Sequence, residues 1–264
     1  MVILQQGGML VPRDELRVPN PGLDFRDKHS PEGPGYVLFL GGSETYGRCV
    51  RQPFPSLFKR LNGSEVLNLG LPNAGYDTIA TDPDVVARAR QAKLVVLQLM
   101  GAHLMTNRFY KVHRRRNDRF LKATASLKTL YPDVDFSQFA FVGHMLRRLQ
   151  RVDPDSFALL VAGLQQGWQQ RLVQMQQLYR RPMVFLWLDH GLGPADVTLT
   201  EPAFAQAGLA GERLLRVGPA PLGRMFLHPE AGGPSVALAP GYHQRIALEL
   251  ADWLPPLMKA AGPL

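Results

Sequence analysis

Cysteine is almost absent from this chain of 264 residues, since Cys49 is the only one. A single thiol excludes an intrachain disulfide and any metal site built from several cysteines. This composition favours a reduced, cytoplasmic setting. We expect Cys49 to be a small buried thiol rather than a nucleophile.

Long apolar runs are missing as well. No stretch of about 18 apolar residues occurs, so the sequence predicts no transmembrane helix. The first residues, from Met1 to Gln6, have neither the basic leader nor the apolar length of a secretory signal. The sequence therefore indicates neither export nor membrane binding.

The motifs of common cofactor sites are also absent. There is no Gly-Lys-Ser/Thr phosphate loop, no Gly-x-Gly-x-x-Gly follows the first predicted strand, and the second glycine of a nucleophile elbow is lacking. The seven histidines are too widely spaced to suggest a metal site, with His103 and His113 as the nearest candidates. We therefore expect no cofactor and no metal ion.

Basic residues, in contrast, are in excess and give a formal net charge of +8 at pH 7. A basic surface attracts anionic metabolites and polyanions. We expect a loop from Arg108 to Arg119 to bind phosphate or carboxylate groups through Arg108, Arg114, Arg115 and Arg116. No nucleic-acid motif surrounds this loop, so a small anionic molecule or a glycan is favoured over nucleic acid. Oligomeric state does not follow from the sequence.

The order of the apolar runs predicts one α/β domain. Residues 1–35 are expected to form an N-terminal arm and residues 36–264 the domain. Strands are predicted at 36–40, 65–69, 93–100, 183–188 and 213–217. Helices are predicted at 54–61, 82–92 and 242–258, the last interrupted by Pro255 and Pro256, and a helical section is predicted from 117 to 181. This alternation indicates a parallel sheet of about five strands with helices on both faces.

Ser43 follows the first predicted strand in the segment Gly-Gly-Ser-Glu-Thr-Tyr-Gly, residues 41–47. Reactive groups of open α/β sheets lie beyond the carboxyl ends of the strands. Gly42 allows a close approach of the backbone to a ligand, and the Ser43 hydroxyl can attack a carbonyl carbon if a base reaches it. The alternative is that Ser43 only caps a helix.

Polar residues also follow the second and third predicted strands. Gly70 and Asn73 offer hydrogen-bond donors for an oxyanion, although a plain turn needs the same residue types. Gly101, His103 and Asn107 follow the third strand. Asn107 could polarise a substrate oxygen, and His103 could serve as base, donor or loop residue.

His243 lies at the predicted start of the last helix. In a parallel sheet, helix starts lie at the same edge as the strand carboxyl ends, so His243 can face Ser43. An imidazole within about 3 Å of a serine hydroxyl is a general base. The alternative is a histidine in the first helical turn with no partner.

Four segments in this order, 39–47, 68–75, 101–107 and the late His243, resemble the Ser-Gly-Asn-His hydrolases, also called GDSL-type lipases and esterases. Residues 37–150 look closer still to an uncharacterised bacterial subgroup known only as a domain of unknown function. The resemblance implies a flavodoxin-like three-layer α/β/α sandwich with a helical insertion. It also implies Ser43 as nucleophile, Gly70 and the Ser43 amide as oxyanion donors, an asparagine after the third strand as a further donor, and His243 as base.

The chain departs from the pattern of that family in two places. His103 stands where the family usually has asparagine, so Asn107 would have to act from farther along, and Pro240 replaces the aspartate that usually precedes the histidine by three residues. An imidazole without an orienting carboxylate can adopt the wrong tautomer, which in serine proteases lowers the rate by about four orders of magnitude. Asp189 is the candidate replacement. The alternatives are that it forms a polar pair with His190 or an ion pair with an arginine.

The sequence thus predicts a serine esterase or acyl transferase that acts on an acylated, anionic small molecule or glycan. The alternative is an inactive relative that binds a ligand in the same cleft, which the two departures favour. A nucleic-acid or protein partner for the basic loop is the third possibility, and a steep salt dependence of binding would be its sign.

Overall fold

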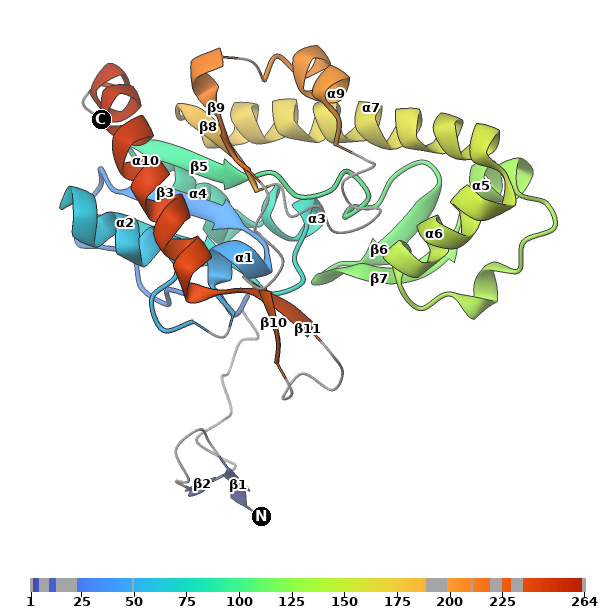
Figure 1. Ribbon diagram of the computed structural model, residues 1–264, viewed down its shortest axis with the longest axis horizontal. Helices are drawn as coiled ribbons and strands as arrows, with labels where there is room; N and C mark the ends of the chain where they lie inside the picture. The colour runs from blue at the N-terminus through green and yellow to red at the C-terminus, as the bar shows by residue number, and fades with distance from the viewer. Residues whose placement is uncertain are drawn as a thin grey trace.

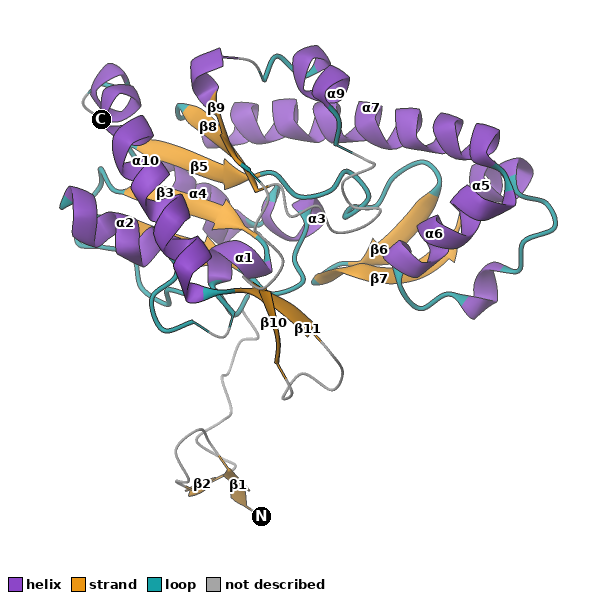
Figure 2. Cartoon of the chain, viewed as in Figure 1, coloured by secondary structure: helices purple, strands orange, loops and turns teal. Residues whose placement is uncertain are grey.

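A parallel five-stranded sheet forms the centre of the protein, in the order β4-β3-β5-β8-β9 (Figures 1 and 2). The computed structural model describes residues 2–4, 10–12, 23–48, 50–188, 199–209, 211–218, 225–228 and 235–262. The sheet comprises β3 (Val37–Gly41), β4 (Val66–Gly70), β5 (Leu94–Gln98), β8 (Met183–Leu188) and β9 (Leu214–Val217). Numbered along the chain, this is the order 2-1-3-4-5 of flavodoxin-like sheets. All five predicted strands are confirmed.

Helices cover both faces of the sheet, because alternate strand residues point to opposite sides. Leu38 and Leu40 of β3 pack into a core shared with α4 (Pro83–Gln91) and α7 (Pro154–Tyr179). Val37 and Phe39 belong to a second core with α2 (Phe54–Asn62) and α10 (Pro240–Ala260), which lie side by side in Figure 1. The predicted three-layer α/β/α sandwich is therefore confirmed.

The insertion between β5 and β8 begins with strands rather than a helix. β6 (Tyr110–His113) and β7 (Arg116–Ala123) pair as an antiparallel hairpin, followed by α5 (Ala125–Leu130), α6 (Val142–Val152) and α7. The prediction of helix from residue 117 is therefore wrong over β7. The basic run has no apolar period of its own, and its backbone hydrogen bonds are satisfied by β6, a partner that local sequence does not reveal.

The last helix, α10, continues through Pro255 and Pro256, so the predicted interruption is wrong. Its buried face, which includes Ile246, Leu250 and Leu254, packs against the second core. Burial of this face offsets the backbone hydrogen bonds that the two prolines cannot make.

The remaining elements are α1 (Ser43–Tyr46), α3 (Tyr76–Ile79), α9 (Glu201–Gln206) and the strand pairs β1 (Val2–Leu4) with β2 (Leu10–Pro12) and β10 (Met225–His228) with β11 (Ser235–Leu238). Phe25 is buried in the first core, and the Arg26 amide donates to the Gly70 carbonyl at 3.1 Å. This part of the predicted arm thus lies along β4. None of the helices in the described ranges is long and apolar enough to cross a membrane.

Candidate functional site

A cavity of about 210 Å³ opens at the carboxyl ends of the central strands. It is bounded by residues that follow β3, β4 and β5, by the ends of β5 and β8, by one residue of β7 and by Leu199. These residues are Gly42, Ser43, Glu44, Asn73, Ala74, Gln98, Leu99, Met100, Gly101, Leu104, Asp118, Trp187, Leu188 and Leu199. The structure therefore brings Gly42, Ser43, Asn73 and Gly101 of the predicted site together.

Ser43 is the first residue of α1, and Gly42 is the N-cap. The Ser43 hydroxyl forms no capping bond; its Oγ instead accepts a hydrogen bond from the Asn73 backbone N–H at 3.1 Å. The interpretation of Ser43 as a helix cap is therefore wrong. The hydroxyl lies on the cavity wall, held from the loop after β4.

Gln98, the last residue of β5, fixes α1 in place. Its buried Oε1 accepts three hydrogen bonds: from the Gly42 amide at 3.1 Å, from the Thr45 amide at 3.3 Å and from the Thr45 hydroxyl at 2.6 Å. Its Nε2 donates to Glu44 Oε2 at 2.8 Å. The Gly42 amide is thus already engaged, so Gly42 contributes to the cavity wall rather than a donor for an oxyanion.

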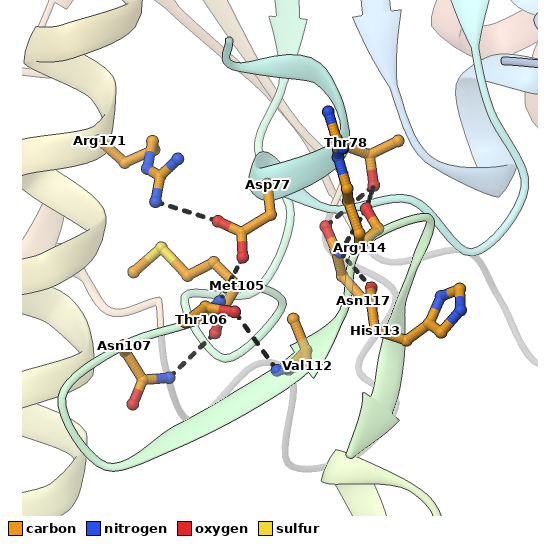
Figure 3. Close-up of polar contacts among 10 residues, drawn as sticks. All are labelled: Asp77, Thr78, Met105, Thr106, Asn107, Val112, His113, Arg114, Asn117 and Arg171. Atoms are coloured by element: carbon orange, nitrogen blue, oxygen red, sulfur yellow. Dashed lines mark hydrogen bonds and ion pairs between the residues drawn. The ribbon is translucent and has the colours of Figure 1, made fainter. Parts of the chain in front are cut away.

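The loop after β4 is connected to the hairpin. Asn73 adopts a left-handed φ of 58°, and its carbonyl accepts from the Asn117 amide at 3.1 Å. The buried Asn117 side chain accepts from the Thr78 hydroxyl at 3.1 Å and donates to the carbonyls of His113 and Arg114 at 2.9 and 3.3 Å (Figure 3). These bonds hold the tip of the hairpin against α3, beside the cavity.

Asp118, next to Asn117, brings a carboxylate to the cavity wall. Its Oδ1 is buried and has no hydrogen-bond partner within the described part of the chain. Burial raises the pKa of the Asp118 carboxyl, while the positive charges of Arg116 and Arg119 oppose this shift. A buried carboxylate oxygen without a donor is unfavourable unless a ligand or water supplies one.

His243 is placed differently from the prediction. Its imidazole is buried and stacks on the Phe54 ring, with 5.8 Å between the ring centroids. Its Nδ1 accepts a hydrogen bond from the Phe54 backbone N–H, with 3.1 Å between the two nitrogens. Burial lowers its pKa to about 4. The neutral ring therefore carries its proton on Nε2, so Nε2 cannot accept the Ser43 proton. No hydrogen bond joins His243 to Ser43.

Gly70 does not face the cavity. Its amide donates to Asn68 Oδ1 at 2.8 Å, and a Cβ atom built on Gly70 would lie 2.2 Å from the Tyr46 nitrogen. The structure therefore gives Gly70 a packing role beneath α1, not the predicted oxyanion contact. Donors available in its place are the Ser43 amide and the Asn73 side-chain amide, for which the described residues provide no acceptor.

Asn107 and His103 also lie away from the cavity. The Asn107 side chain closes its own loop: Nδ2 donates to the Met105 carbonyl at 3.0 Å (Figure 3). Its Oδ1 accepts a hydrogen bond from the Phe109 amide at 2.9 Å. His103 is buried, and desolvation lowers its pKa to about 4. Asn107 therefore cannot replace the missing oxyanion donor, and His103 is a core residue of the loop.

The predicted anion-binding arginines divide into two groups. Arg114, Arg115 and Arg116 are exposed at the tip of the hairpin beside the cavity. Arg108 instead stacks on the Phe109 ring, 4.6 Å from its centroid, and lines a separate groove along α7. Arg108 is therefore not part of the same site.

Asp189 and Cys49 lie outside the described residues. Within the described ranges, no group of three or more His, Cys, Asp or Glu side chains could hold a metal ion.

Gln98, Asp118 and Trp187 also line the cavity, and none of them was predicted from the sequence. Gln98 could have been found, because it is the one polar side chain in an apolar strand. Asp118 could not have been found in this way, because it lies in a basic segment among four arginines that indicates only an exposed loop.

The fold and the site define a flavodoxin-like α/β protein with a serine at the carboxyl edge of its sheet. The chain belongs to the family described as Domain of unknown function (DUF6473), whose sequence model matches residues 1–211. The predicted closeness to an uncharacterised subgroup is thereby confirmed. None of the curated proteins matches the sequence.

Several solved structures are similar to this chain. A G-D-S-L family protein from Desulfitobacterium hafniense DCB-2 has a TM-score of 0.47 and 12% identity, covering 83% of this chain and 99% of the neighbour. The lipase Lip_vut3 from a goat rumen metagenome has a TM-score of 0.43 and 13% identity, covering 86% and 97%. A carbohydrate esterase family 2 enzyme from Corynascus thermopiles has a TM-score of 0.42 and 14% identity, covering 97% and 70%. The activities in these names are those of the neighbours.

Proposed function

We propose that the protein is a serine esterase or acyl transferase with Ser43 as its nucleophile. The observation that carries the proposal is the position of the Ser43 hydroxyl on the cavity wall, oriented by the Asn73 amide at 3.1 Å. Acyl transfer requires a fixed hydroxyl near free amide donors, and the Ser43 amide and Asn73 side chain have no acceptor among the described residues.

The cavity suits a small acyl group. Trp187, Leu188 and Leu199 supply an apolar wall, while Ser43 and Asp118 are polar. At about 210 Å³ the space holds a short or compact acyl chain rather than a long lipid tail. The exposed arginines of the hairpin tip favour a substrate with a negative charge outside the cavity.

The test is the variant Ser43→Ala with 4-nitrophenyl acetate as substrate. Loss of a serine nucleophile typically lowers kcat by about 10⁶, so turnover should fall to the background rate. Ser126→Ala, on the exposed face of α5, is the matched control and should keep wild-type rates. Equal rates in wild type and Ser43→Ala would refute the proposal.

A second candidate function is ligand binding without turnover, and the position of His243 favours it. An imidazole whose Nδ1 accepts the Phe54 amide does not activate the serine. A fluorophosphonate separates the two functions, because it labels only an activated serine. Labelling of wild type but not of Ser43→Ala supports the enzyme; no labelling of either supports the binding protein.

A further inference from the structure

Within the described part of the chain, the cavity wall holds an unused hydroxyl proton and an unused carboxylate acceptor. Ser43 Oγ accepts the Asn73 amide hydrogen, but its own proton has no acceptor among the described residues. Asp118 Oδ1 is a buried acceptor without a donor in the same part of the chain. Glu44, the other carboxylate of the cavity, already receives a hydrogen bond from Gln98 at 2.8 Å.

We infer that Asp118 is the proton acceptor for Ser43, acting directly or through one bound water. This inference rests on the proposed function and supplies the base that His243 does not provide. It assigns a catalytic residue to the hairpin β6–β7, outside the central sheet.

The backbone connects the two residues by a short path. The Asn73 amide donates to Ser43 Oγ, the Asn73 carbonyl accepts from the Asn117 amide, and Asp118 follows Asn117. Each of these two hydrogen bonds is 3.1 Å long. These two bonds fix the hairpin next to the loop that holds the serine, and Ser43 and Asp118 line the same cavity. The proposal requires the carboxylate to reach the serine proton directly or through one water, as a general base must.

The chemistry balances with ester and water alone. Ser43 Oγ bonds to the acyl carbon as its proton passes to Asp118, and the resulting oxyanion faces the Ser43 amide and the Asn73 side chain. The carbon–oxygen bond to the alcohol then breaks, and Asp118 returns the proton to the leaving alkoxide. Water attacks the acyl-enzyme in the same way, which releases the acid and restores Ser43.

The charges around Asp118 set its pH behaviour. Arg116, Arg119 and His113 on its own hairpin favour the carboxylate, and Glu44 of α1 is the other carboxylate that lines the cavity. Burial outweighs the positive charges and raises the pKa of Asp118. Activity therefore requires deprotonated Asp118 and should increase with pH through this raised value.

The test compares Asp118→Asn, Asp118→Glu and the exposed control Asp133→Asn on 4-nitrophenyl acetate across the acid pH range. Asparagine keeps the shape of aspartate but cannot accept the proton, so kcat/KM should fall by about 10² or more and the rising limb should vanish. Asp118→Glu should keep part of the wild-type kcat/KM, and its kcat/KM should rise with pH over a different pH range. Asp133→Asn should match wild type, because its side chain is exposed on a loop.

His243 also ionises in the acid pH range. A rise of kcat/KM with pH is therefore assigned to Asp118 only if Asp118→Asn removes that rise. An unchanged rate and limb in Asp118→Asn, with Ser43→Ala inactive, overturns the inference and leaves the proposed function intact. If wild type and Ser43→Ala are equally inactive, both fail. A thermal unfolding midpoint for Asp118→Asn at or above that of wild type shows that any lost activity is not misfolding.

Discussion

At the scale of single residues, the position of Ser43 depends on Gln98. One amide oxygen accepts three hydrogen bonds from the turn that starts α1, and the amide nitrogen holds Glu44. Gly41 makes this close approach feasible, because a Cβ there would lie 2.5 Å from Gln98 Oε1. Ser43 is thus positioned by a strand residue that bonds to Gly42 on one side of it and to Glu44 and Thr45 on the other.

We therefore expect Gln98→Leu to destabilise the protein and to lower activity together. Leucine leaves the Gly42 and Thr45 donors buried and unpaired, at about 1–3 kcal/mol for each orphaned group. Urea unfolding should show a free energy of unfolding lower by about 3 kcal/mol in total. The same replacement at the exposed Gln150 of α6 should change it by less than about 0.5 kcal/mol. A Gln98→Leu protein as stable as wild type would contradict this role.

At the scale of elements, the hairpin β6–β7 carries both a cavity residue and three exposed arginines. Its tip is fixed by the buried Asn117, which bonds to α3 and to the hairpin backbone (Figure 3). The positive charge is therefore presented beside the cavity at a fixed place. The proposed anionic substrate would place its charged group in the field of these arginines, outside the cavity.

Reversing the charge of Arg114, Arg115 and Arg116 to glutamate should raise KM for an anionic ester but not for a neutral one. A tenfold rise in KM corresponds to about 1.4 kcal/mol, a reasonable effect for several exposed charges at low salt. The matched control reverses Arg147, Arg148 and Arg151, which are exposed on α6. Equal KM changes in both triple variants would show that only net charge matters.

At the scale of the whole molecule, two buried imidazoles link stability to pH. Burial lowers the pKa of both His103 and His243 to about 4, below the usual value near 6.5. Between these values the unfolded chain binds more protons than the folded one, so stability falls as pH decreases from 6.5 towards 4. Each histidine should contribute a loss of about 2 kcal/mol between pH 7 and pH 5.

Urea unfolding at several pH values measures this loss. His103→Gln should have a shallower pH dependence than wild type, even if it is less stable at pH 7. Gln150→Leu, which changes no titratable group and lies at an exposed position of α6, should keep the wild-type slope. A wild-type stability that does not change between pH 7 and pH 5 would show that the two rings are not held neutral by burial.

Much of the fold could be predicted from the sequence because continuous apolar runs such as 37–40 and 94–97 form parallel strands wherever helices cover both faces. The hairpin could not be predicted: the run from Arg116 to Arg119 has no apolar period and becomes a strand only beside β6. The continuation of α10 through Pro255 could not be predicted either, because it depends on the burial of residues from Ile246 to Leu254 against the second core.

For the site, the sequence by itself determined that a serine between glycines follows the first strand of the sheet, since this order is written in residues 36–47. Only the tertiary structure decided which groups meet it. Asn73, Gln98 and Asp118 reach the cavity from three separate parts of the chain. Asn107 and His243 accept hydrogen bonds from backbone amides elsewhere, and the Gly70 amide donates to the Asn68 side chain. The physical reason is that each polar side chain binds the nearest unsatisfied donor or acceptor, and folding alone determines which one is nearest.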